Sequence, residues 1–251
     1  MLNVSRENAI LSIEICRPDK KNALVPQMYH DMALALESAD SADIKAVLIK
    51  GSHGCFTAGN DIADFMSKNE DKDIKDTYRF MMSLVNCPVP VVAQVEGLAI
   101  GIGTTLLLHC DFVYCDENAK FAMPFINLGL VPEYASSYIL PRISGNLKAA
   151  ELLLLGETFD AEKAYECGIV SKVVSSEELP NLISQTLTKL VDKPKMALVQ
   201  SKALLRNQKD DIEKHILLEL EVFAKAMVSE PAKEAFSAFL EKRPVNKHLF
   251  K

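Results

Sequence analysis

The chain lacks several patterns that mark common classes of function. Its six cysteines form no C-x-x-C pair, and no histidine stands at zinc-finger spacing from them, so we expect no metal site. No apolar stretch is long enough to cross a bilayer, and the net charge of −6 argues against nucleic acid or an anionic membrane as a partner. The absence of a G-x-S-x-G elbow and of a G-x-G-x-x-G fingerprint argues against a serine hydrolase and a dinucleotide-binding domain.

The remaining composition is that of an ordinary globular protein. The chain has 251 residues, of which 49% are hydrophobic and 25% charged, enough to bury a sizeable core. Arg6 and Glu7 precede any apolar run, and the chain ends in Leu249-Phe250-Lys251, which is no peroxisomal address. We therefore expect a cytoplasmic protein without membrane insertion. Cys110 and Cys115 lie in apolar surroundings and are expected to be reduced core residues.

The hydrophobic pattern predicts an α/β fold followed by a helical tail. Short apolar segments predict strands, and apolar residues at helical spacing predict helices between them. The expected strands are 9–16, 44–49, 91–95 and 111–114, and the expected helices are 25–38, 73–85, 104–109, 177–190, 194–206, 210–228 and one from Pro231. We expect a core over residues 1–193 and an oligomerisation module over 194–251. The simpler alternative is that the last helices only cover their own core.

Two glycine-containing turns are candidates for binding an oxyanion through main-chain N–H groups. In the segment 57–61, Gly59 permits unusual backbone angles that can aim the Asn60 N–H into a cavity. The turn Gly101-Ile102-Gly103 precedes an apolar helix, whose first N–H groups have no partner within the helix. The alternatives are an ordinary polar loop and a tightly packed strand-to-helix turn.

Together, these motifs resemble the crotonase superfamily of acyl-CoA enzymes. The resemblance runs from the segment 17–24 through both glycine turns to the segment 239–243, and thus covers nearly the whole chain. The Pro-Phe…Leu-Gly…Pro-Glu…Ser-Ser-Tyr pattern over 124–138 is similar to the peroxisomal-type Δ3,Δ2-enoyl-CoA isomerase branch. The resemblance implies a spiral of ββα units with a C-terminal helical trimerisation module. It also implies a homotrimer or a dimer of trimers that acts in acyl-CoA metabolism such as fatty-acid β-oxidation.

The resemblance also implies ligand-binding roles. The oxyanion donors match the backbone N–H groups of Asn60 and Ile102, the latter standing where most relatives have Gly. Coenzyme A enters as part of the substrate and not as a separate cofactor. Positions that match its binding residues are Lys20, Lys21, Ala23, Ala58, Asn60, Asp61 and Ile62. Phe223 and Lys242 match tail positions that cover the adenine end, often from a neighbouring subunit; the alternatives are a core residue and a solvated charge.

Glu133 is the expected catalytic base. Hydratases of the family use two glutamates, and their places are taken here by Thr105 and Phe125. Hydration needs one group to deprotonate water and another to protonate carbon, whereas moving a double bond needs a single base. Glu133 matches the isomerase base, and its apolar neighbours are expected to raise its pKa. Asp61 is expected to fix the oxyanion loop through Asx-type bonds and not to act as a second acid.

The expected function is therefore a Δ3,Δ2-enoyl-CoA isomerase. One alternative is a hydratase, or another acyl-CoA lyase or hydrolase of the same fold, which needs a second acid such as Asp61 or Asp64 in the pocket. Another is a non-catalytic acyl-CoA-binding protein, in which Glu133 would face bulk solvent, away from the two N–H groups.

Overall fold

A twisted, mainly parallel sheet forms the centre of the molecule. The structure is a computed structural model that describes residues 1–65 and 70–250. In that part of the chain, six strands pair in the order β1-β2-β3-β4-β6-β9. The first pair is antiparallel and the later pairs are parallel. The strands are β1 (Leu2–Glu7), β2 (Ile10–Ile15), β3 (Ala46–Gly51), β4 (Val91–Val95), β6 (Phe112–Asp116) and β9 (Lys172–Val174).

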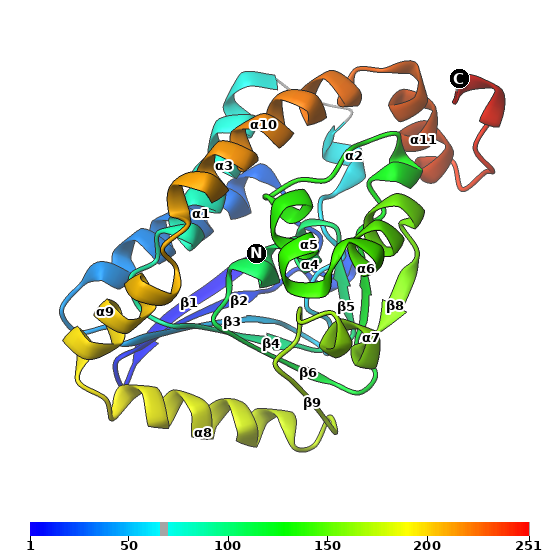
Figure 1. Cartoon of the computed structure of the whole chain (residues 1–251). Coiled ribbons are helices and arrows are strands. Elements are labelled where there is room, and N and C mark those ends of the chain that lie inside the picture. The colour runs from blue at the N-terminus through cyan, green and yellow to red at the C-terminus, as the bar shows by residue number, and fades with distance from the viewer. Residues whose placement is uncertain (66–69, 251) are drawn as a thin grey trace.

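Helices cover both faces of this sheet. On one face, α1 (Pro26–Glu37) and α3 (Glu70–Val85) pack over the large core (Figure 1). On the other face lies α8 (Leu179–Val191), whose buried residues recur at helical spacing and meet Leu48 and Val92 of the sheet. Because β3 and β4 are covered on both sides, they are almost continuously apolar, as is typical of buried parallel strands.

A smaller sheet lies at one end of the large one (Figure 1). It contains β5 (Leu98–Ile100), β7 (Lys120–Ala122) and β8 (Thr158–Asp160), in the order β5-β7-β8. Short helices lie in the same stretch of chain: α2 (Ile62–Phe65), α4 (Ile102–Thr105), α5 (Ser136–Ser144), α6 (Asn146–Ala150) and α7 (Ala161–Glu166). Of these, α4 contacts β5, and α7 contacts β7 and β8. Both oxyanion-turn candidates and Glu133 belong to this end of the molecule.

The C-terminal helices make specific contacts with the core. They are α9 (Lys195–Leu205), α10 (Lys209–Met227) and α11 (Glu230–Leu240). On α9, the buried Lys202 Nζ lies 2.6 Å from Asp111 Oδ2 and donates to the Val89 carbonyl at 2.8 Å. Helix α10 runs along α3 (Figure 1), where the Tyr78 hydroxyl donates to Glu213 Oε1 at 2.8 Å. Hydrogen bonds and an ion pair therefore join the C-terminal helices to their own core.

The predicted α/β order is confirmed, with differences in the small elements. The expected helix over 104–109 is a short α-helix, α4, continued by the 3₁₀ segment Leu106–His109. The three-residue strands of the small sheet were not predicted, because so few residues give no alternating pattern. Cys110 and Cys115 are free and buried, as expected. No helix in the described residues is long and apolar enough to span a membrane.

Candidate active site

The two glycine turns lie against each other. The Thr57 N–H donates to the Leu98 carbonyl at 2.8 Å, and the Ile100 N–H donates to the Thr57 carbonyl at 3.1 Å. A Cβ on Gly59, whose φ is +82°, would lie 2.5 Å from the Ile100 carbonyl oxygen. A Cβ on Gly103 would lie 2.5 Å from Thr57 Cγ2. The backbone approach therefore requires glycine at both positions, and it packs the turn that contains Asn60 against the turn that contains Ile102.

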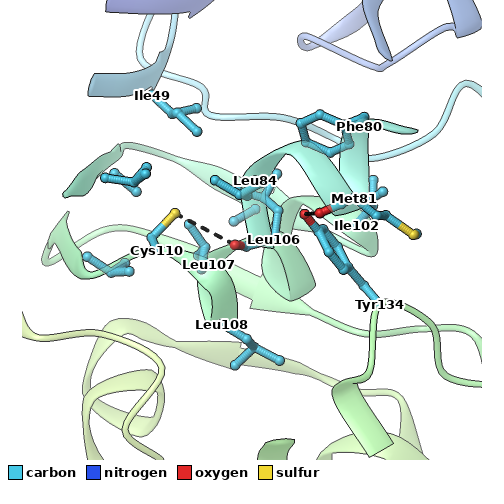
Figure 2. Close-up of a cluster of buried hydrophobic side chains, with 14 of the residues drawn as sticks. Ile49, Phe80, Met81, Leu84, Ile102, Leu106, Leu107, Leu108, Cys110 and Tyr134 are labelled. Carbon is cyan, nitrogen blue, oxygen red and sulfur yellow. Dashed lines mark hydrogen bonds between the residues drawn. The ribbon is translucent and has the colours of Figure 1, made fainter. Parts of the chain in front are cut away.

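The N–H groups of Asn60 and Ile102 have no partner among the described residues. On either side of Asn60, the Gly59 carbonyl and the Asp61 N–H both bond to Leu24, at 2.8 and 2.9 Å. Ile102 is the first residue of α4, where an N–H has no partner within the helix. In residues 1–65 and 70–250, neither N–H has an acceptor. The Ile102 side chain belongs to the core cluster with Phe80, Met81 and Tyr134 (Figure 2).

Glu133 is buried against the helix that begins at Ile102. Only 4% of the residue is exposed, and Oε1 accepts a hydrogen bond from the Thr105 hydroxyl. Thr105 lies one turn after Ile102 on α4, so the carboxyl is tied to the helix that presents the second N–H. Burial raises the pKa of Glu133 to about 8, opposed by the Thr105 bond and assisted by the nearby charge of Glu219. The expected upward shift of this pKa is thus present.

The two places of the hydratase acids hold groups that do not ionise. Thr105 is fully buried, and its hydroxyl donates a hydrogen bond to Glu133. The Phe125 ring lies beside the second turn, where a Cβ on Gly101 would be 3.9 Å from Phe125 Cε1. Phe223 of α10 packs edge-on against that ring, with 6.4 Å between centroids. One place therefore holds a hydroxyl bonded to Glu133, and the other holds an apolar ring packed against Phe223.

Asp61 is occupied within the loop. Its Oδ2 lies 2.7 Å from Arg17 Nη1, and its Oδ1 accepts from the Ala63 N–H at 3.2 Å. The second contact is the Asx-type bond expected for this residue. The side chain of Asp64, the other acid considered, lies outside the described residues.

Most of the expected coenzyme A positions gather at the first turn. Lys20 and Lys21 are exposed at the end of the 3₁₀ turn Pro18–Lys20, and the Lys21 carbonyl accepts from the Ala58 N–H at 3.0 Å. Ala23, Ala58, Asn60, Asp61 and Ile62 follow along the same bridged segments. Phe223 is a buried neighbour of Phe125, and Lys242 is exposed beyond α11.

Three supporting residues were not found from the sequence. The buried Tyr29 donates its hydroxyl to Asn60 Oδ1 at 2.5 Å, and Arg17 braces Asp61. Glu219 bonds to the turn after Glu133. Tyr29 gave no signal, because it lies in the apolar face of its helix. Glu219 did give one, because it is an acid in line with the buried residues Ile212, Ile216 and Phe223.

The fold and the site together point to the crotonase class of enzymes. The family model for enoyl-CoA hydratase/isomerase matches residues 5–248. The chain therefore belongs to this family of the crotonase superfamily.

Within the family, some relatives of this chain are named isomerases and others hydratases. "Enoyl-CoA delta isomerase 2" of Rattus norvegicus is 33% identical over 96% of this chain, which spans 63% of that protein's length. "Probable enoyl-CoA hydratase echA8" of Mycobacterium bovis is also 33% identical, over 96% of this chain and 95% of that protein. The crystal structure of an enoyl-CoA hydratase/isomerase from Pseudoalteromonas atlantica has a TM-score of 0.92 at 37% identity, covering 98% of both chains. Overall identity therefore does not separate the two reactions.

Proposed function

We propose that this protein is a Δ3,Δ2-enoyl-CoA isomerase in which Glu133 shuttles a proton between C2 and C4 of the acyl chain. The observation that carries the proposal is the buried carboxyl of Glu133, bonded to Thr105, with Phe125 at the other hydratase position. A site with one acid supports a shift of a double bond better than the addition of water.

The proposed reaction has two proton transfers. Ionised Glu133 removes a proton from C2 of a 3-enoyl-CoA, and the C–H electrons form a C1–C2 double bond as the thioester oxygen becomes an oxyanion. The N–H groups of Asn60 and Ile102 donate to that oxygen. Glu133 then returns the proton to C4, where the C3–C4 π electrons form the new C–H bond. The C1–C2 π electrons move to C2–C3, the oxyanion re-forms the thioester carbonyl, and the carboxylate is regenerated. A pKa of about 8 suits this role, because both protonation states are accessible near neutral pH.

The main chain is proposed to stabilise the intermediate. Each donor of such a hole typically contributes ~10²–10³ in rate. Because Asn60 and Ile102 act through backbone N–H groups, an isoleucine at 102 is compatible with the role. We further propose that Lys20 and Lys21 bind the phosphates of coenzyme A, which gives the acidic chain a local basic patch.

Contacts of the two acids weigh against the alternatives. A hydratase of this fold needs a second acid, and Asp61 is held by Arg17 and the Ala63 N–H. A non-catalytic binding protein would leave Glu133 in solvent, but its carboxyl is buried and bonded to the helix that begins at Ile102.

The deciding experiment compares two substrates. The purified protein is incubated with a 3-enoyl-CoA and, separately, with a 2-enoyl-CoA, and the products are separated by chromatography. We expect conversion of the 3-enoyl-CoA to the 2-enoyl isomer, with only weak formation of 3-hydroxyacyl-CoA from the 2-enoyl-CoA. Vigorous hydration would support the hydratase, and tight binding of both without turnover would support the binding protein.

We also propose that the protein acts as a trimer or a dimer of trimers in the cytoplasm. Large apolar side chains are exposed on α6, α9 and α11, among them Leu147, Met196, Leu204, Leu205 and Phe239. Closed symmetric assembly is a common way to cover such surface. Light scattering at micromolar concentration is expected to give three or six times the chain mass of 27.8 kDa, and a monomer would contradict this expectation.

A further inference from the structure

The turn that follows Glu133 has a costly backbone conformation. Tyr134 and Ala135 both have positive φ, 59° and 56°, although neither is glycine. Consecutive left-handed residues with side chains are rare, because the Cβ of each approaches its own carbonyl group. Such a conformation persists only where surrounding contacts impose it. The contacts on this turn therefore decide where the Glu133 carboxyl lies.

One set of contacts fixes Tyr134 from the core side. Its hydroxyl donates to the Met81 carbonyl at 3.0 Å, as Figure 2 shows. Its ring stacks on His109 with 4.0 Å between centroids. His109 Nε2 lies 2.8 Å from the Tyr134 carbonyl, which can only accept, so this nitrogen carries the hydrogen. Burial lowers the pKa of His109 to about 3, which keeps the ring neutral.

A second set of contacts comes from the C-terminal helix α10. Glu219 Oε2 accepts from the Ala135 N–H at 2.5 Å, and Oε1 accepts from the Ser137 N–H at 3.1 Å. Oε1 also accepts from the Ser137 hydroxyl. Ala135 and Ser137 lie at the start of α5, where N–H groups have no partner within the helix. A carboxylate from another part of the chain thus caps this helix.

Glu133 is connected to the same cap. Its carbonyl accepts from the Ser136 N–H at 3.1 Å and from the Ser136 hydroxyl at 2.7 Å. Ser136 lies between the two residues whose N–H groups bond to Glu219. Glu219 therefore holds Ala135 and Ser137, and Ser136 between them holds the Glu133 carbonyl, so the three residues link Glu219 to the backbone of Glu133.

We propose that Glu219 is a positioning residue for Glu133, and this inference rests on the proposed role of Glu133 as the base. Glu219 holds the left-handed turn closed, so that the Glu133 carboxyl meets Thr105 and faces the Asn60 and Ile102 N–H groups.

The burial of Glu219 supports a role beyond packing. Only 7% of the residue is exposed, and it shares the buried face of α10 with Ile212, Ile216 and Phe223. Burying a carboxyl is unfavourable unless its oxygens are bonded, so an apolar residue would satisfy packing at lower cost. A carboxyl supplies what an apolar residue cannot, namely acceptors for three donors of the turn. With Phe223 against Phe125, α10 thus supports both the base and a wall of the site.

The test replaces Glu219 with glutamine. The glutamine amide offers one acceptor oxygen and places NH₂ against the second N–H donor, so the turn loses a bond and gains a repulsion. We expect kcat on a 3-enoyl-CoA to fall ~10–100-fold, as small misplacements of reacting groups do, with KM within ~3-fold of wild type. Glu221→Gln is the matched control, because Glu221 lies on the same helix, exposed and paired with Lys225. Its kcat should equal that of wild type.

Loss of folding is separated from loss of positioning by melting curves. If Glu219→Gln does not fold, Glu219→Asp takes its place, since the shorter carboxylate cannot reach both N–H groups and should lower kcat in the same way. A folded variant with wild-type kcat, or with KM raised as much as kcat falls, would overturn the proposal.

A double-mutant cycle tests whether Glu219 acts through Glu133. In a Glu133→Gln background, Glu219→Gln should lower the residual rate less than ~3-fold, because little base remains to position. A further ~10-fold loss would show an independent role and contradict the proposal. If Glu133→Gln alone keeps the wild-type rate, the proposed function fails. If Glu133→Gln is impaired and Glu219→Gln is not, only the positioning role fails.

Discussion

The two glycine turns and the loop of Glu133 are built in opposite ways. At Asn60 and Ile102 the proposed role belongs to the main chain, and glycines at 59 and 103 allow the two backbone segments to approach. At Glu133 the proposed role belongs to a side chain, and the left-handed turn after it contains no glycine. That turn is held by Met81, His109 and Glu219, residues distant in sequence.

This difference determines which changes each region tolerates. A main-chain donor survives most side-chain substitutions, provided that the neighbouring glycines remain. A catalytic side chain on a strained turn depends on its own identity and on each distant contact that holds the turn. Mutations of the two regions should therefore give different patterns of loss in activity and stability.

The largest effect is expected from Glu133→Gln. Glutamine keeps the shape and can still accept from Thr105, but it cannot remove the C2 proton. The isomerase rate should fall by the ~10²–10⁴ expected for a lost general base, with little change in acyl-CoA binding. Steady-state kinetics and titration with a saturated acyl-CoA measure the two quantities. A variant that isomerises at nearly the original rate would remove Glu133 from the mechanism.

Gly59→Ala should produce the next largest loss. The new Cβ would lie 2.5 Å from the Ile100 carbonyl, and φ is +82°, so the first turn must shift and carry the Asn60 N–H with it. We expect a rate loss approaching the ~10²–10³ of a removed oxyanion donor. Gly54→Ala is the control, because Gly54 also has a positive φ, +67°, but no atom lies within 4 Å of the new Cβ. Equal losses in the two variants would mean that general strain, and not the contact with Ile100, is responsible.

The same contrast explains what the sequence could predict. The strands over 91–95 and 111–114 and the helix over 25–38 were predicted because their hydrophobic periods are continuous. The two glycine turns were visible as contiguous motifs, but each alone favoured an ordinary loop or turn. Their oxyanion role came from the resemblance of the whole chain to a family, and it stays a prediction.

The support of the base could not be predicted in the same way. Glu219 follows Glu133 by 86 positions, and the bond to Ala135 depends on how α10 packs on the core. Likewise, no local pattern shows that the Tyr29 hydroxyl reaches Asn60. The acid within the apolar face of α10 was a visible signal of a buried bond, but it did not identify the partner.

A moderate effect is expected from pH. Because the pKa of Glu133 is raised to about 8, the fraction of ionised base in the free enzyme falls tenfold per unit below that value. We expect kcat/KM to rise with pH and to reach half its plateau near 8. The measurement is a pH–rate profile between about 5.5 and about 9.5. A profile already flat above 5.5 would show that the carboxyl titrates near its ordinary value of 4.5.

The same shift predicts how stability depends on pH. The folded pKa of about 8 lies above the ordinary 4.5, so between these values the folded state holds a proton that the unfolded state has lost. Stability therefore declines as pH rises through this window, by at most about 1.4 kcal/mol per unit from this one group. Glu133→Gln removes that decline, so the stability of the variant relative to wild type should increase from pH 5 to pH 8. Thermal unfolding measures this as a difference in melting temperature, and chemical unfolding as a difference in the free energy of unfolding. A constant difference would contradict the assignment.

The smallest effect on rate is expected from Asn60→Ala. The backbone N–H remains, so the rate should fall less than the ~10²–10³ of a lost donor, and we expect less than ~10-fold. Stability should respond more, because the buried Tyr29 hydroxyl loses its acceptor, at a cost of about 1–3 kcal/mol in the free energy of unfolding. In a Tyr29→Phe background no hydroxyl is left unpaired, so the same substitution should destabilise less. If the rate of a folded Asn60→Ala variant instead falls as far as it does when an oxyanion donor is removed, the side chain carries the role. The contrast between a main-chain site and a side-chain site then does not hold.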